Sequence, residues 1–124
     1  MKTPTVLLIL EESHDLEIYG TFLRDRGYET LMCTSPSEGI NSLETESVSL
    51  VIVSQGTRAF EGRQVPERSL QLHPEVPVLV VARVLDIHCY LEAMDLGAID
   101  YLERPEPPDL VWVVDTQMLR AASA

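Results

Sequence analysis

The sequence predicts an α/β fold in which helices cover both faces of a parallel sheet, as a single domain spanning residues 1–124. Three runs, at residues 5–10, 48–54 and 77–82, are apolar almost throughout instead of alternating with polar residues. Such runs are typical of strands buried on both faces, in the middle of a parallel sheet. Amphipathic segments separate them, and alternating strands and helices form doubly wound sheets with right-handed crossovers.

Five strands and five helices are predicted in strict alternation, without a linker, an internal repeat or a low-complexity segment. The strands are placed at residues 5–10, 29–34, 48–54, 77–82 and 98–102. The helices are placed at residues 15–26, 37–43, 65–72, 86–96 and 109–119.

End signals and apolar periodicity support each helix in turn. Ser13 or His14 is expected to cap the first helix, and Gly27 ends it. Ser35 caps the second, with Pro36 at its first position. The stripe expected to face the core in the first helix is Ile18, Tyr19, Phe22 and Leu23.

Proline and glycine delimit the later helices. Pro66 is compatible only with the first turn of the third helix, His73-Pro74 ends that helix, and Gly97 ends the fourth. The apolar stripes of the last two helices are Ile87, Leu91 and Met94 in one, and Val111, Val114 and Met118 in the other.

Five alternating units favour the flavodoxin-like strand order 2-1-3-4-5. This order places the ends of the first and third strands side by side, at the edge where open α/β sheets bind their ligands. Glu11 and Ser54 follow or end these strands. We therefore expect them to face each other across one crevice.

Charge and composition exclude several classes of protein. Nine basic and twenty acidic residues give a net charge of −11, which argues against direct binding of nucleic acid. No apolar stretch is long enough to span a membrane, and Met1-Lys2-Thr3-Pro4 lacks the layout of a signal peptide. Cys33 and Cys89 have no ligand-spaced neighbours and are expected to be reduced thiols. A cytoplasmic protein is expected.

Several motifs together resemble the receiver domain of bacterial response regulators, the CheY-like family, over essentially the whole chain. The stretch from Gly97 to Leu102, which precedes the basic Arg104 and Pro105, is the most specific of them. The motifs are the acidic pair Glu11-Glu12, the Glu61-Gly62 step, Gly97-Ala98-Ile99-Asp100-Tyr101-Leu102, and Arg104-Pro105.

The resemblance implies a phosphorelay site, in which an aspartate on the third strand takes a phosphoryl group from a kinase. An acidic pair holds Mg²⁺, a hydroxyl and a lysine bind the phosphoryl oxygens, and an aromatic residue reports the state. In this sequence the corresponding positions hold Ser54 for the aspartate, Leu10-Glu11 or Glu11-Glu12 for the acidic pair, Ala82 for the hydroxyl, Arg104 for the lysine and Tyr101 for the aromatic residue.

These departures predict a receiver of two-component signalling, not an enzyme, that is not phosphorylated in the usual way. A serine hydroxyl needs a base that a carboxylate does not need. Mg²⁺ binding is expected to be weak or absent, with Glu11 as a weak candidate ligand, and no other cofactor is expected. We expect Glu11 to contact Arg104 and close the pocket.

Two alternatives to a receiver that is not phosphorylated in the usual way remain. The first is a phosphorylatable receiver in which a displaced carboxylate such as Glu61 is the acceptor. The second is a flavodoxin-like cofactor-binding protein, which is disfavoured because the acidic residues 11–15 replace a phosphate-binding loop.

An interaction surface is expected around Tyr101, Trp112 and Val113. Trp112 lies off the predicted core stripe, and exposed aromatic residues are enriched in interfaces, although the indole could also fold over Pro107-Pro108. Tyr101 is either a switch or an ordinary half-buried aromatic residue. The expected protein partners are a second copy, through the helix at 86–96, the strand at 98–102 and the helix at 109–119, and a kinase or an output domain in a longer chain.

Overall fold

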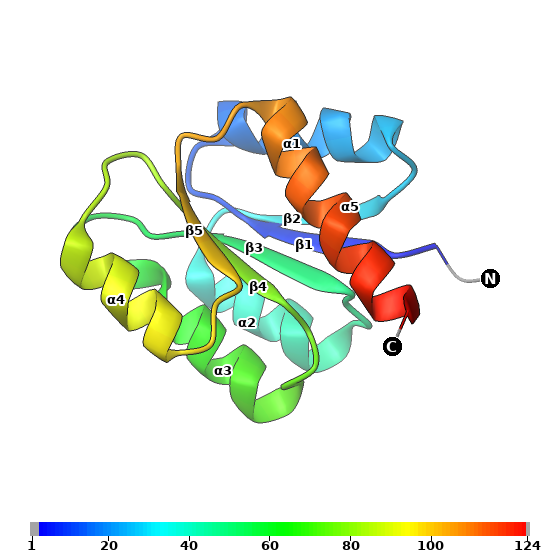
Figure 1. Cartoon of the computed structure of the whole chain (residues 1–124). Coiled ribbons are helices and arrows are strands. Elements are labelled where there is room, and N and C mark those ends of the chain that lie inside the picture. The colour runs from blue at the N-terminus through cyan, green and yellow to red at the C-terminus, as the bar shows by residue number, and fades with distance from the viewer. Residues whose placement is uncertain (1–2, 124) are drawn as a thin grey trace.

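The computed structural model describes residues 3–123. Met1 and Lys2, the first two residues of the segment judged above for a signal peptide, lie outside the described residues. Five parallel strands form one sheet in the order β2-β1-β3-β4-β5, which confirms the prediction (Figure 1). The strands are β1 (Thr5–Ile9), β2 (Glu29–Cys33), β3 (Leu50–Ser54), β4 (Val78–Ala82) and β5 (Asp100–Glu103). The helices are α1 (Ser13–Asp25), α2 (Pro36–Thr45), α3 (Gln64–Leu72), α4 (Ile87–Asp95) and α5 (Pro107–Ser123), with a 3₁₀ turn η1 (Glu61–Arg63) before α3.

Helices cover both faces of the sheet, which explains why the central strands are apolar on both sides. Helices α1 and α5 pack on one face, and α2, α3 and α4 pack on the other (Figure 1). Successive residues of a strand point to opposite faces. Thus Ile52 belongs to the core under α1 and α5, whereas Val53 belongs to the core under the other three helices.

The helix ends follow the sequence signals in most cases. The Ser35 hydroxyl accepts a hydrogen bond from the Glu38 N–H at 3.3 Å, and Pro36 opens α2. Gly27 has a φ of 101°, a conformation that L side chains rarely adopt. The expected cap of α1 is wrong, because Glu12 holds the N-cap position and makes no capping hydrogen bond with its side chain.

The apolar stripe predicted for α4 is also wrong. Ile87, Leu91 and Met94 are exposed, and the buried residues of this helix are the smaller Cys89 and Ala93. Small side chains let a helix axis approach the sheet closely, so α4 packs through them and turns its larger side chains outward.

Helices α1 and α5 also differ, to a smaller extent, between the predicted apolar stripe and the residues that are buried. Phe22 of the predicted α1 stripe is exposed, and Leu16 is buried in its place. In α5 the fully buried residues are Leu110 and Val114, whereas Val111 is only partly buried. Within residues 3–123, no helix is both long enough and apolar enough to cross a membrane.

Candidate functional site at the carboxyl edge of the sheet

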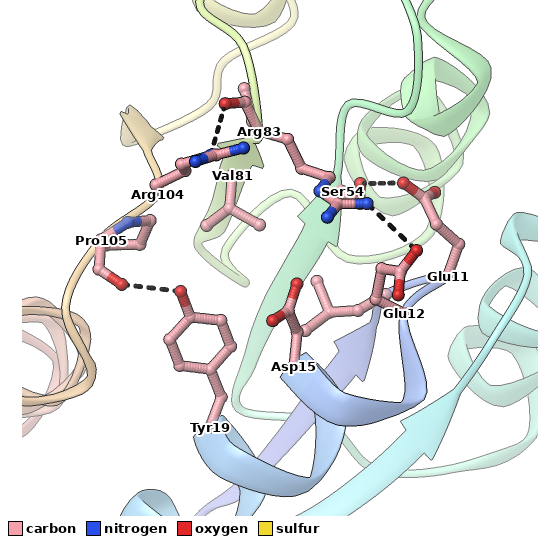
Figure 2. Close-up of a pocket in the computed structure, with 11 residues that line it drawn as sticks. Glu11, Glu12, Asp15, Tyr19, Ser54, Val81, Arg83, Arg104 and Pro105 are labelled. Atoms are coloured by element: carbon pink, nitrogen blue, oxygen red, sulfur yellow. Dashed lines mark hydrogen bonds and ion pairs between the residues drawn. The ribbon is translucent and has the colours of Figure 1, made fainter.

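A pocket of about 320 Å³ opens at the carboxyl edge of the sheet (Figure 2). Its walls come from the ends of β1, β3, β4 and β5 and from the start of α1. The pairing of Ile9 with Val53 brings the residues that follow β1 next to the end of β3. The lining residues are Leu10, Glu11, Glu12, Asp15, Tyr19, Ser54, Val81, Ala82, Arg83, Arg104 and Pro105.

Ser54 is held at the centre of this pocket by two hydrogen bonds. Its hydroxyl donates to Glu11 Oε1 at 3.1 Å and accepts from the Gly56 N–H at 3.1 Å. The side chain of Leu10 is buried in the core under α1. The acidic side chains at the mouth of the pocket are therefore those of Glu11 and Glu12.

Arg83 reaches across the pocket mouth, a role that was not predicted from the sequence. Its guanidinium forms an ion pair with the Glu12 carboxylate at 3.0 Å. Both side chains are about half exposed, so water screens their attraction. The available signal was a basic residue directly after the buried strand β4, at the edge that already carried two glutamates.

The expected contact between Glu11 and Arg104 is wrong. Figure 2 shows the two side chains on opposite sides of the pocket. Arg104 has a φ of 39°, and its backbone N–H donates to the Ala82 carbonyl oxygen at 2.8 Å. Its Nε donates to the Arg83 carbonyl oxygen at 3.0 Å, so the backbone of the β4–α4 loop takes the place expected for Glu11.

A tyrosine from α1 closes the opposite wall of the pocket. The Tyr19 hydroxyl donates to the Pro105 carbonyl oxygen at 2.6 Å (Figure 2). The pKa of Tyr19 is raised, mainly by burial and to a lesser extent by the nearby carboxylates of Asp15 and Glu106. The hydroxyl therefore stays protonated and ties the β5–α5 loop to α1.

Tyr101 lies on the other side of the sheet, and its side chain is 6% exposed. Its hydroxyl donates to Gln55 Oε1 and accepts from the Asp86 N–H at 3.1 Å. Its ring packs edge-on against Tyr90, with centroids 5.6 Å apart. Burial is the main cause of its raised pKa. Because the ring is buried, the expectation that Tyr101 belongs to an exposed interaction surface is wrong.

The residues that hold Tyr101 are themselves fixed. Gln55 is 2% exposed, and its Nε2 donates to the Thr57 carbonyl oxygen at 3.3 Å. The Asp86 carboxylate caps α4 by accepting from the Cys89 N–H at 3.0 Å. That hydrogen bond is the main reason for the lowered pKa of Asp86. A connected set of hydrogen bonds thus runs from the end of β3 to the start of α4.

Glu61, the displaced acceptor of one alternative, lies outside the pocket lining. Its carboxylate accepts from the Thr57 N–H at 2.7 Å and from the Thr57 hydroxyl at 2.9 Å. A hydrogen bond from its own backbone N–H, followed by those from Thr57, lowers the pKa of Glu61. The carboxylate is therefore occupied in stabilising its own loop.

Trp112 is 68% exposed, as expected, and Val113 is partly buried beside it. The indole lies on the outer side of α5 between two shallow grooves. One groove, of about 420 Å³, runs toward β5, and the other, of about 400 Å³, runs toward α1.

The family of the chain follows from a direct match. Residues 6–115 match the model of the response regulator receiver domain. The chain belongs to this family. As a receiver domain, it has the five-stranded doubly wound fold of two-component signalling proteins, in agreement with the sequence-based prediction.

The receiver is similar to known regulators along its whole length. It is 25% identical over 124 residues to the transcriptional regulatory protein GlrR of Escherichia coli K12, covering 99% of this chain and 28% of GlrR. It is 26% identical over 103 residues to a putative NtrX-like response regulator of Rickettsia bellii, covering 80% of this chain and 21% of that protein. The chain thus spans about a quarter of the length of these relatives.

A solved receiver shows the same fold. The CheY-like receiver domain of Methanospirillum hungatei superposes with a TM-score of 0.89 at 19% identity, covering 99% of this chain and all of that one.

Proposed function

We propose that this receiver is not phosphorylated in the usual way and acts as a phosphorylation-independent protein-interaction or dimerisation module. Ser54 carries the proposal. It ends β3, where the family resemblance implies the acceptor aspartate, and its hydroxyl is hydrogen-bonded to Glu11 and Gly56.

The chemistry of the pocket supports this role. A carboxylate is ionised at neutral pH, whereas a serine hydroxyl must lose its proton to a base before it can attack phosphorus. No histidine lines the pocket, and the Ser54 hydroxyl donates to the carboxylate of Glu11, which is a weak base. Ala82 also offers no hydroxyl for a phosphoryl oxygen.

The pocket does not fit Mg²⁺ well. Hard oxygen ligands in octahedral geometry are what Mg²⁺ requires. Of the two glutamates at the mouth, Glu11 accepts from Ser54, and Glu12 is paired with Arg83. In the part of the chain that the structure describes, no three acidic, histidine or cysteine side chains gather as a metal site. We infer that Arg83 supplies the positive charge that the family obtains from the metal.

We propose a protein partner for the surface formed by α4, β5 and α5. Its support is the exposed apolar row Val84, Leu85, Ile87, Leu91 and Met94, which the fold itself does not bury. Since the chain spans only part of its relatives, a kinase or an output domain in a longer protein is the proposed partner. The buried, unpaired thiols of Cys33 and Cys89 support a location in the reducing cytoplasm.

The test is an amide ¹H–¹⁵N spectrum recorded during titration with Mg²⁺ and then with beryllofluoride, which mimics a phosphoryl group on aspartate. We expect the amides of Glu11, Ser54 and Tyr101 to stay unchanged in the natural protein. The matched variant Ser54→Asp supplies a third carboxylate and is expected to respond to Mg²⁺. Saturable shifts in the natural protein would overturn the proposal and return it to the ordinary phosphorelay.

A further inference from the structure

The outer side of α5 carries an apolar stripe that the domain does not use for its own core. Trp112 is 68% exposed and Leu119 is 70% exposed. They are seven residues apart and therefore lie on the same side of the helix. The core-facing residues Leu110 and Val114 occupy the opposite side.

A groove runs beside this stripe, between α5 and α1. It has a volume of about 400 Å³, and the exposed ring of Phe22 and the indole of Trp112 stand along it. Asp115 also lines the groove and accepts a hydrogen bond from Arg26 Nε at 2.8 Å, so its charge is paired. An apolar side chain can therefore enter the groove beside Asp115 without burying an unpaired charge, provided that Asp25, an exposed residue that also lines the groove, stays in water.

The charges that flank the stripe favour one orientation of a second copy. Asp109 and Arg120 are exposed, lie on the same side of the stripe, and form no ion pair with another residue of the described range 3–123. A parallel two-fold pair of α5 helices would place these charges on opposite flanks of the contact, where they would not meet their counterparts. An antiparallel pair centred between Trp112 and Leu119 would place each Asp109 near the Arg120 of the other copy.

We propose that a second copy of this chain binds here, through an antiparallel two-fold pairing of α5 helices. In this pairing Leu119 of each copy packs against Trp112 of the other, beside the groove that Phe22 lines. The interface is isologous, because both copies use the same surface. It shares α5 and Trp112 with the surface expected from sequence but leaves out α4, which covers the other face of the sheet (Figure 1).

The net charge of −11 acts against the pairing at long range. Salt screens such repulsion beyond a Debye length of about 10 Å at 0.1 M, whereas the flanking pairs act at contact distance. The interface is also small, because it is built mainly from one 17-residue helix. A weak dimer is therefore expected, of micromolar affinity or weaker.

The test uses sedimentation equilibrium from about 1 µM to about 500 µM, a range suited to such affinities. Trp112 is the only tryptophan, so its emission reports the interface directly. We expect dimerisation, with a blue shift of the emission as concentration rises. Leu119→Glu should abolish both changes. Leu70→Gln, at an exposed position of α3 outside both proposed surfaces, is the matched control and should change neither.

A charge exchange tests the orientation. Asp109→Arg and Arg120→Asp should each weaken the dimer by about tenfold or more, because each sets like charges against one another. The double variant should recover most of the loss. Acidic residues near a helix start and basic ones near its end also stabilise the helix alone. This stabilisation of the single helix cannot explain a rescue, because the double variant places an unfavourable charge at both ends of α5.

Three results would overturn the inference. The first is a monomer at every concentration, both with and without beryllofluoride. The second is a dimer that Leu91→Gln abolishes and Leu119→Glu leaves intact, because the interface would then lie on α4. The third is no rescue in the double variant while its circular dichroism stays native. The inference does not depend on an inactive pocket. A dimer that forms only with beryllofluoride would contradict the proposed function and leave this interface standing. A protein that is monomeric and also unresponsive to beryllofluoride would contradict this interface and leave the inactive pocket of the proposed function standing.

Discussion

Ser54 and Gln55 are neighbours at the end of β3, yet their side chains lie in opposite environments. Ser54 faces the open pocket, where its contacts are charged and reached by water (Figure 2). Gln55 points to the other side of the sheet and is buried against the Tyr101 hydroxyl. The alternation of side chains along a strand produces this division within two residues.

The pocket side and the Tyr101 side of the sheet differ in the interactions that stabilise them. Exposed ion pairs such as Arg83–Glu12 contribute little to stability, because solvent competes for both charges. A buried hydrogen bond contributes little while it is intact, but its loss leaves a polar group without a partner. The buried side should therefore be the sensitive one, although the family's chemistry belongs to the open side.

The largest effect is expected at Gln55 and Tyr101. Gln55→Leu leaves the buried Tyr101 hydroxyl without its acceptor. Tyr101→Phe leaves Gln55 Oε1 without its donor and the Asp86 N–H without its acceptor. Each variant should lower the free energy of unfolding by about 2 kcal/mol. The double variant should be more stable than the sum of the single effects predicts, because it removes both polar partners together. Urea denaturation measures all three, and strict additivity would contradict the coupling.

An intermediate effect is expected at Asp86, which caps α4. Asp86→Ala should lower the melting temperature by a few degrees, as the loss of a cap does in a domain of this size. Because its folded-state pKa is lowered from 3.8, the carboxylate stabilises the fold above that value, and the contribution disappears as pH falls through the lowered pKa.

Asp86→Asn is the matched control for that prediction, since it keeps an oxygen that can cap the helix but cannot titrate. The stability difference between the natural protein and Asp86→Asn should shrink at the acid end of a thermal-denaturation series. A difference that is constant with pH would exclude Asp86 as the titrating group.

The smallest effect on stability is expected at Arg83. Arg83→Ala should change the free energy of unfolding by less than about 0.5 kcal/mol, because the pair with Glu12 is exposed. The same variant frees Glu12 and should strengthen the response of the pocket amides to Mg²⁺. If thermal denaturation shows a large loss while Mg²⁺ binding stays unchanged, then Arg83 supports the fold and does not replace the metal.

The sequence was sufficient for the sheet because a strand buried on both faces has a distinctive composition. Residues 6–10 and 50–53 are apolar without interruption, so the central position of these strands in the sheet could be predicted. The face of α4 could not, because the helix carries apolar residues on two sides. Which side packs depends on how closely the small Cys89 and Ala93 let it approach the sheet.

The contacts inside the site could be predicted less well than its members. Glu11, Glu12, Ser54 and Arg104 do line one pocket, because each follows or ends a parallel strand. Their pairing depends on backbone angles that the sequence does not state, such as the positive φ of Arg104. The partner of Tyr101 was missed for a simpler reason, since Gln55 lies just beyond the strand predicted at residues 48–54.

The hydrogen bonds that join α1 and the residues just after it to α5 and the loop before it also bear on when the chain can fold. Arg26 and Tyr28 both hydrogen-bond to Asp115, and Tyr19 to Pro105, across separations of 86 to 89 residues. Contacts so distant in sequence close late, because loop entropy is lost before they form. During synthesis on the ribosome, α1 would therefore have no α5 to pack against until the last helix is made, and part of its apolar face would stay exposed until then. A chain truncated before residue 107 should aggregate or bind chaperones.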